Sequence, residues 1–164
     1  HEMCEGDLVQ TRDNGFQPIR WIGFRHIAQY RMRYNPTLRP VCFKSNELDL
    51  YVSQQHRMLM QENGNEFFVP SKSLVGTDRC SFAFTDIDYY HMLFDQHEVV
   101  MANGVWSESL YLGDQALKSL TVSQRLEIDM IFPELDMLPK LARTHIGPKK
   151  FNRTYEPSML PMGM

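Results

Sequence analysis

The stretch LVQTRDNGFQPIRWIGF, residues 8–24, decides which fold class we expect. The apolar run at residues 8–11 predicts a strand, and residues 18–24 predict the strand that returns beside it. Between them, Asp13, Asn14 and Gly15 form a turn sequence of the kind that needs a positive φ angle. The stretch therefore predicts a β-hairpin near the start of the chain.

Short apolar runs separated by turn signals continue through the first two thirds of the chain. We expect further strands at residues 39–44, 48–53, 57–61, 66–69, 89–94 and 98–102. Asn63-Gly64-Asn65 predicts a second hairpin turn, and Asn103-Gly104 predicts the turn after the last of these strands. Because no helical pattern intervenes, the sequence predicts a mainly β, antiparallel architecture that is rolled or sandwich-like.

After Gly113 the apolar spacing changes to that of two short helices. The apolar positions that carry this pattern are Ala116, Leu117, Leu120, Leu126, Ile128, Ile131 and Phe132. Thr121 and Gln124 have the spacing of a capping box, and Pro133 predicts the end of the second helix. We expect one domain over residues 1–135 and an irregular tail over residues 136–164.

Composition and charge exclude several classes of protein. Hydrophobic residues make up 43% of the chain and charged residues 23%, which favours one globular domain over disorder. A net charge of -3 gives no general attraction to phosphate, so we do not expect nucleic acid as a partner. No apolar run approaches the ~20 residues of a membrane-spanning helix, so we expect no membrane segment. Three widely spaced cysteines match neither a disulfide framework nor a paired zinc motif, and we expect reduced thiols or small core residues.

Two groups of residues around histidines carry the candidate chemistry, because imidazole can take or give a proton near neutral pH. Ser53 and His56 lie three residues apart directly after an apolar run, so a turn there would bring them to one place. His91 lies within a predicted strand, and Asp95 and His97 flank the turn into the next strand. Together these residues offer a proton donor, a hydroxyl and a carboxylate, but no strong nucleophile.

Simpler roles remain open for each of these residues. Ser53 can close a turn, and His91 can be a hydrogen-bonded core histidine. Asp95 and His97 can form an exposed turn pair of little consequence. A zinc site built from the histidines lacks a closely spaced ligand pair, so we expect no metal and no cofactor.

Four segments, taken in order and spacing, resemble the bacterial Hint family, which is related to hedgehog and intein processing domains. They are EGDLVQTRDNG at residues 5–15, QPIRWIG at residues 17–23, SQQHRML at residues 53–59 and HMLFDQHEVVMANG at residues 91–104. The resemblance extends from Glu5 to about Phe132. It implies a Hint-type (hedgehog/intein) rolled antiparallel β fold with two short C-terminal helices.

The resemblance also implies a chemistry. In such domains a Cys or Ser at the first position attacks the preceding carbonyl and turns a peptide bond into a thioester or ester. The family's Thr-x-x-His motif, which polarises that peptide and protonates its leaving amine, is similar to Ser53-Gln54-Gln55-His56. His91 falls near a position that inteins fill with Asp or Cys, and His97 matches a histidine of the intein carboxy-terminal blocks. The implied partner is the polypeptide that flanks the domain on its N-terminal side, as a substrate in cis.

Two departures from the family pattern bear on activity. The first-position cysteine belongs on a strand upstream of Gly6, and Cys4 lies too close to that motif to replace it. We therefore expect this chain, which looks cut from a longer protein, to be inactive as it stands. Where inteins end in His-Asn, this sequence has Glu108-Ser109, so we expect cleavage or transfer at the amino-terminal junction in place of splicing.

Three hypotheses follow. The first is self-processing that occurs once per molecule, in place of enzymatic turnover, with Ser53 and His56 assisting the acyl shift. The second is a non-catalytic interaction or scaffold module of a larger secreted or surface protein, and the third is a small metal-dependent hydrolase. A Cys or Ser on the first strand of the parent protein would favour the first hypothesis over the second. The oligomeric state and the compartment, cytoplasmic or part of a secreted bacterial protein, stay open.

Overall fold

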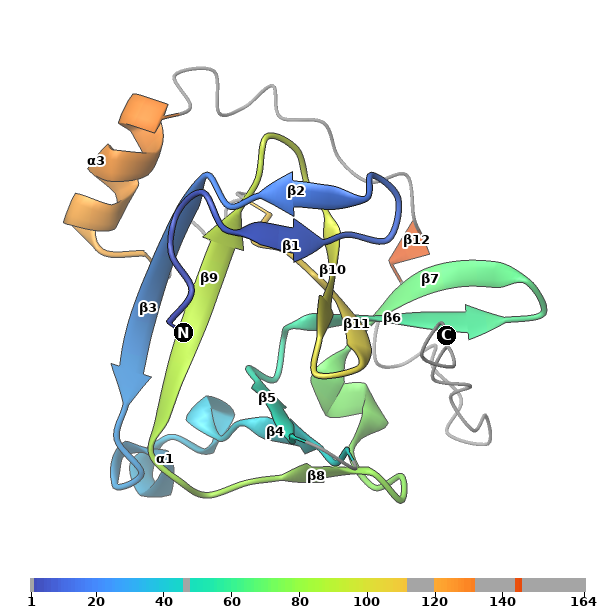
Figure 1. Ribbon diagram of the computed structural model, residues 1–164. Helices are drawn as coiled ribbons and strands as arrows, with labels where there is room; N and C mark the ends of the chain where they lie inside the picture. The colour runs from blue at the N-terminus through green and yellow to red at the C-terminus, as the bar shows by residue number, and fades with distance from the viewer. Residues whose placement is uncertain (1, 46–47, 112–119, 132–143, 146–164) are drawn as a thin grey trace. The chain divides into compact units, whose positions relative to one another are not determined.

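The computed structural model describes residues 2–45, 48–111, 120–131 and 144–145, and β strands are the main regular secondary structure among them (Figure 1). The strands are β1 (Leu8–Gln10), β2 (Phe16–Pro18), β3 (Trp21–Ile27), β4 (Val41–Phe43), β5 (Leu50–Val52), β6 (Arg57–Glu62), β7 (Asn65–Pro70), β8 (Cys80–Phe82), β9 (Ile87–Leu93), β10 (Val99–Ala102), β11 (Val105–Glu108) and β12 (Thr144–His145). The helices are α1 (Arg31–Tyr34) and α3 (Val122–Ile131), with 3-10 turns η1 (Pro36–Leu38) and η2 (Ser71–Leu74). The predicted mainly β class is confirmed.

The chain divides into two compact units. The first contains the described residues of His1–Phe24, Tyr90–Val100 and Glu108–Ala142. The second contains those of Arg25–Tyr89, Met101–Ser107 and Arg143–Met164. Each unit is built from separate pieces of the chain, and strands β3, β9, β10 and β11 each contribute residues to both.

In the first unit, β1 and β2 form the predicted hairpin. The strands are antiparallel, with Leu8 opposite Pro18. Gly15 has a φ of 66°, the positive value that the turn sequence predicted. Thr11 closes the turn, since its Oγ1 donates to the Gly15 carbonyl at 2.7 Å and accepts from Asn14 N at 3.2 Å. The hairpin is thus fixed by contacts among neighbouring residues.

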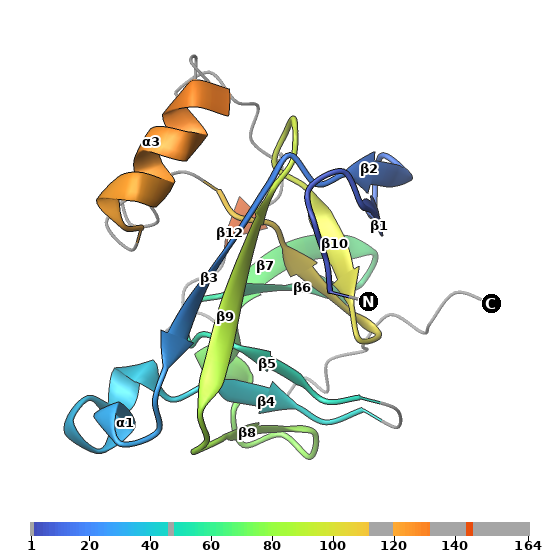
Figure 2. The same cartoon turned by 60° about the vertical axis from the view of Figure 1, so that its left-hand side comes forward.

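The predicted return strand at residues 18–24 is wrong as one continuous element, because the chain changes partners at Ile19 and Arg20. Ile19 N donates to the Asp7 carbonyl at 2.9 Å, whereas Arg20 N donates to the Leu93 carbonyl at 2.8 Å. Pairing therefore passes from β1 to β9, and β3 begins only at Trp21. Strands β3 and β9 then run side by side as a two-stranded sheet (Figure 1 and Figure 2).

Gly23 lies under the indole of Trp21. A Cβ atom at Gly23 would overlap that ring, so only glycine at this position leaves room for the indole. Trp21 is 2% exposed, and its Nε1 donates to Glu127 Oε2 of α3 at 3.2 Å. Trp21 and Leu93 pack with Ile128 of the same helix, so the Trp-Ile-Gly sequence joins β3 to α3.

Helix α3 begins with the predicted capping box. Gln124 N donates to Thr121 Oγ1 at 3.3 Å, and Thr121 N donates to Gln124 Oε1 at 3.0 Å. This reciprocal pair satisfies backbone donors that would otherwise have no helical partner. The other predicted helix, Pro133 and most of the expected tail lie outside the described residues. Within that tail, Thr144–His145 forms β12, so these two residues are a strand and not irregular.

The second unit holds a three-stranded sheet in the order β5-β4-β8, with Cys42 opposite Tyr51 on one side and Ser81 on the other. It also holds the β6 and β7 hairpin, paired from Arg57 opposite Pro70 to Glu62 opposite Asn65. Its turn is the hairpin turn predicted at Asn63-Gly64-Asn65, and its φ angles are positive, 48° at Asn63 and 79° at Gly64. The Asn103-Gly104 turn repeats this geometry with φ angles of 48° and 78°.

Strand β7 also pairs with β12, in parallel, and the order of the larger sheet is β10-β11-β6-β7-β12. The sequence did not predict β8, β11, α1, η1 or η2. None of the helices in the described residues has the length and apolarity to span a bilayer.

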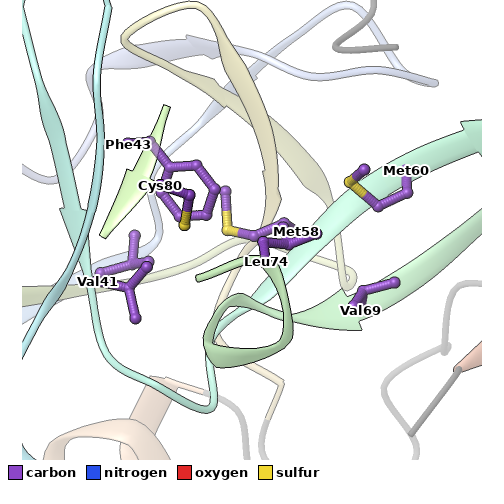
Figure 3. Close-up of a cluster of buried hydrophobic side chains, with 8 residues drawn as sticks. Val41, Phe43, Met58, Met60, Val69, Leu74 and Cys80 are labelled. Atoms are coloured by element: carbon purple, nitrogen blue, oxygen red, sulfur yellow. The ribbon is translucent and has the colours of Figure 1, made fainter. Parts of the chain in front are cut away.

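The core of the second unit is formed by apolar side chains from both of its sheets and from η2. Figure 3 shows them converging: Val41, Phe43, Met58, Met60, Val69, Leu74 and Cys80. A cavity of about 20 Å³ remains beside Met58, Cys80 and Trp106. Small-molecule sites are usually larger by an order of magnitude or more, at roughly 300–1,000 Å³. This cavity is therefore smaller than a typical small-molecule site.

Candidate functional site

Ser53 and His56 are the two ends of a tight turn between β5 and β6, which we name the His56 turn (residues 53–56). His56 N donates to the Ser53 carbonyl at 3.0 Å, the bond that closes a four-residue β-turn. Such a turn brings the first and last Cα atoms within about 7 Å of one another. Both residues are partly buried. The predicted turn is confirmed, and it brings the backbones of Ser53 and His56 close together.

The first residues of η2 hold the backbone of the His56 turn. Ser71 N donates to the His56 carbonyl at 2.8 Å, and Ser71 Oγ donates to the Ser53 carbonyl at 2.8 Å. Lys72 N donates to the Gln54 carbonyl at 3.2 Å. On its other side the turn is tied to η1, because Gln54 Nε2 donates to two backbone carbonyls there at 2.8 and 3.2 Å. The turn is therefore fixed from two directions.

In the first unit, His97 is 6% exposed and lies next to a carboxylate. Its Nε2 is 3.7 Å from Glu108 Oε2, and the Glu108 side chain is 17% exposed. The ring of Tyr111 lies against the imidazole, with ring centroids 5.2 Å apart. A carboxylate beside an imidazole can orient the ring and stabilise its protonated form.

The residue after His97 is anchored at both its backbone and its side chain. Glu98 is fully buried, and its carboxylate accepts hydrogen bonds from Asn14 Nδ2 at 2.9 and 3.0 Å and from Gln96 Nε2 at 2.9 Å. Glu98 N donates to Ser109 Oγ at 2.9 Å, and Ser109 N donates to the Glu98 carbonyl at 2.8 Å. These bonds fix the chain next to His97.

His91 and Asp95 are placed less favourably for joint chemistry. His91 is half-buried on β9, whereas Asp95 lies beyond the end of that strand, with a 66% exposed side chain. Leu93 and Phe94 are both 2% exposed, so the alternation of faces ends before Asp95. Asp95 Oδ1 lies 3.3 Å from Arg20 Nε, an exposed ion pair of a kind that contributes little to stability.

The five predicted site residues fall in both units. Ser53 and His56 belong to the second, whereas His91, Asp95 and His97 belong to the first. The structure brings Ser53 to His56 and, separately, Glu108 to His97; a single site containing all five stays a prediction. Across the described ranges, no group of three or more His, Cys, Asp or Glu residues could hold a metal ion.

Comparison with known proteins identifies the family. A family model described as the Hint domain matches residues 1–114, more than half of the 164 residues. This chain belongs to the Hint domain family. The match contains all five predicted site residues, and it confirms the Hint-type resemblance and β fold inferred from the four sequence segments. Searches among curated proteins and among solved structures each found no match.

Sequence reasoning missed three residues of this Hint domain that contact or directly adjoin the candidate groups. Glu108 was considered only as a replacement for an intein terminus, yet it lies beside His97. The sequence carries no signal for Glu98 or Ser71, because neither their residue types nor their spacings are unusual. A fully buried Glu beside a candidate histidine is recognisable only once its burial is known.

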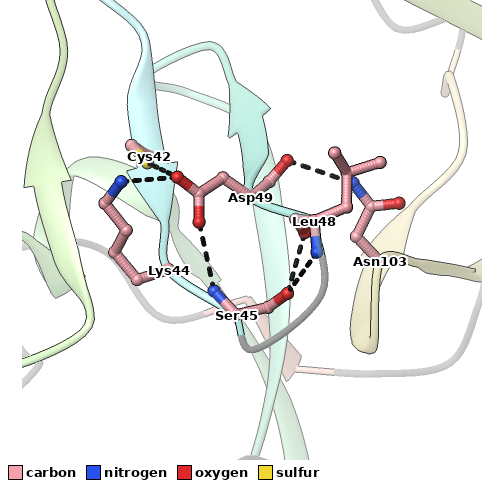
Figure 4. A network of polar contacts seen from close by, with 6 residues as sticks. All are labelled: Cys42, Lys44, Ser45, Leu48, Asp49 and Asn103. Carbon is pink, nitrogen blue, oxygen red and sulfur yellow. Dashed lines mark hydrogen bonds and ion pairs between the residues drawn. The ribbon is translucent and has the colours of Figure 1, made fainter.

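The Hint domain also carries a polar network in its second unit, centred on Asp49 (Figure 4). Lys44 Nζ donates to Asp49 Oδ2 at 2.5 Å, and Ser45 N donates to Asp49 Oδ1 at 3.3 Å. Asn103 Nδ2 donates to the Asp49 carbonyl at 3.1 Å. The hydrogen bond from Lys44 holds the pKa of Asp49 below its ordinary value. The adjacent Cys42 thiol has a raised pKa, chiefly because it is buried. This network supports the β4 and β5 pair.

Proposed function

We propose that this Hint domain promotes autocatalytic cleavage of the polypeptide that precedes it in the same protein. The reaction is an acyl shift at the amino-terminal junction, and the His56 turn supplies its acid–base assistance. What supports the proposal is the closed turn in a member of this family: His56 N donates to the Ser53 carbonyl at 3.0 Å. A group held in one geometry before reaction avoids the entropic cost of being ordered during it.

The proposed shift exchanges one bond for another. A Cys or Ser side chain at the start of the domain attacks the carbonyl carbon of the residue before it, so a C–S or C–O bond forms and the peptide C–N bond breaks. The nucleophile loses a proton to His56, and the leaving amine gains one. His56 delivers that second proton, and the Ser53 hydroxyl hydrogen-bonds the same peptide. A second nucleophile, water or a thiol, then releases the upstream fragment.

His97 has a separate proposed role, as the base that activates the second nucleophile. Its imidazole is buried beside Glu108, with Nε2 3.7 Å from the carboxylate. As His97 takes up a proton, the carboxylate would balance the new charge. This arrangement needs no metal and no cofactor.

The test is expression of the protein from its complete coding sequence, followed by mass spectrometry with and without added thiol. We expect a fragment that ends at the junction, formed faster when thiol is present. His56→Ala should slow its formation by about 10²-fold or more, the usual contribution of one acid–base group. His26→Gln is the matched control, because His26 is an exposed imidazole paired with Asp88 in the same unit. It should cleave at the unmodified rate.

Two outcomes of this test would contradict the proposal. If the protein stays intact and forms no thiol adduct, self-processing is excluded and a non-catalytic interaction module takes its place. If cleavage occurs but His56→Ala cleaves as fast as His26→Gln, the reaction does not use the His56 turn.

The role of His97 is tested by Glu108→Gln, which keeps the shape of the side chain and removes its charge. We expect release of the upstream fragment to slow by about tenfold, with the ester or thioester accumulating. Glu5→Gln alters an exposed carboxylate and should change nothing. Equal rates in the two variants would remove Glu108 from the mechanism.

A further inference from the structure

The start of η2 faces the His56 turn because of the hairpin register. In the β6 and β7 hairpin, Arg57 lies opposite Pro70, so Ser71 follows directly opposite His56. Pro70 has no backbone N–H, and the first donor after the strand is therefore Ser71 N, which bonds to the His56 carbonyl at 2.8 Å. The amide of Ser71 thus extends the ladder by one pair.

The hydroxyl of Ser71 reaches across to the opposite end of the same turn. Ser71 Oγ donates to the Ser53 carbonyl at 2.8 Å, and that carbonyl also accepts His56 N at 3.0 Å. One residue therefore bonds to both ends of the turn, through two different groups. Ser71 is fully buried, and a buried hydroxyl is costly unless it is hydrogen-bonded. Both bonds are consequently shielded from competing water.

Ser73 provides a contrast two residues later. It lies in the same 3-10 turn and is 7% exposed. Its Oγ is buried yet has no hydrogen-bond partner in the described part of the chain. Burial in η2 alone therefore does not account for the contacts that Ser71 makes.

We infer that Ser71 is a positioning residue for the self-processing reaction: its hydroxyl fixes the Ser53 carbonyl, and so holds His56 where the acyl shift needs it. The inference rests on the proposed function. As a positioning residue, Ser71 acts through its bonds to the turn and not on the reacting atoms. Loss of its hydroxyl should loosen the turn while the amide bond to the His56 carbonyl remains.

The experiment compares Ser71→Ala with Ser73→Ala in the protein expressed from its complete coding sequence. Each substitution removes one buried hydroxyl from η2, but only the first removes a hydrogen bond to the His56 turn. Two quantities are measured: the cleavage rate and the hydrogen-exchange rate of the His56 amide. We expect Ser71→Ala to slow cleavage about tenfold and to speed exchange at His56 about tenfold. Ser73→Ala should leave both rates within about twofold of the unmodified protein.

A third variant distinguishes the loss of the Ser71 hydroxyl from a general loss of folding. Ser71→Thr keeps a hydroxyl at the same position, so it should recover most of the cleavage rate that Ser71→Ala loses. Exchange at the β1 amides, which belong to the first unit, should be the same in all variants. The inference is overturned if Ser71→Ala and Ser73→Ala slow cleavage equally, or if Ser71→Ala changes neither rate. If the unmodified protein does not cleave, the proposed function fails. Exchange at His56 then still decides whether Ser71 holds the turn.

Discussion

Asn14 Nδ2 donates to both carboxylate oxygens of Glu98, at 2.9 and 3.0 Å, across 84 positions of the sequence. The bonds join the turn between β1 and β2 to the start of β10. The backbone continues the connection, because Arg12 N donates to the Val99 carbonyl at 2.8 Å. The Asp13-Asn14-Gly15 sequence therefore both forms a hairpin turn and supplies donors to a buried carboxylate.

Replacing Asn14 by Ala should destabilise the protein by about 1–2 kcal/mol, because the buried carboxylate loses a donor that serves both its oxygens. Urea unfolding at pH 7 measures the change. Gln17→Ala, which removes only an exposed bond to the Asn14 carbonyl, should cost less than about 0.5 kcal/mol. Equal losses in the two variants would mean that Glu98 does not depend on Asn14.

Gly23→Ala should destabilise the protein by about 1–3 kcal/mol, since the added methyl group overlaps the Trp21 ring and forces it to move. The indole should also lose its bond to Glu127, so its fluorescence should shift to longer wavelength. Arg25→Ala, a change at an exposed position of the same strand, is the control. An unchanged unfolding midpoint in Gly23→Ala would show that the ring has room to move.

The three thiols should differ in reactivity. Burial raises the pKa of Cys80 to about 12 and also raises that of Cys42, so neither forms much thiolate at pH 8. Cys4 is exposed, and a disulfide reagent should modify it first, with the other two reacting only on unfolding. Counting the released chromophore before and after denaturant tests this. Rapid release of three equivalents from the folded protein would contradict it.

Asp49→Asn should destabilise the protein at neutral pH and have less effect in acid. The hydrogen bond from Lys44 lowers the pKa of Asp49 in the folded state. The carboxylate therefore contributes stability above its unfolded-state pKa of about 3.9, and this contribution is lost as the pH falls through the lower folded value. Urea unfolding at pH 7 and at pH 3 measures the difference. A loss of stability in Asp49→Asn that is equal at the two pH values would contradict the prediction.

Features set by neighbouring residues were predictable from the sequence. The Asn63-Gly64 and Asn103-Gly104 turns followed from residues that tolerate positive φ, and the α3 cap followed from Thr121 and Gln124. Distant partners decided what was missed. The break between β2 and β3 exists because Arg20 pairs with Leu93, and β8 exists because it pairs with β4. Neither pairing changes the local apolar pattern.

The candidate site likewise has one contact that was predictable from neighbouring residues and others that depend on distant segments of the chain. The His56 turn is a contact between residues three apart, so the spacing of Ser53 and His56 was enough to predict it. The approach of Glu108 to His97 depends on where the chain returns after the Asn103-Gly104 turn. The contacts of Ser71 depend on the register of β6 and β7. A one-residue slip in a register reverses the face of every side chain, so such contacts required the structure.

Within the described residues, the chain passes from one compact unit to the other four times, and every passage lies inside a strand. The passages are at residues 24–25 in β3, 89–90 in β9, 100–101 in β10 and 107–108 in β11. A single truncated chain therefore cannot contain all of one unit without parts of the other. Cutting the protein into fragments would also break the hydrogen bonds between paired strands. Insertion of a tag or a cleavage sequence is better tolerated at the Asn63-Gly64 turn, which belongs wholly to one unit.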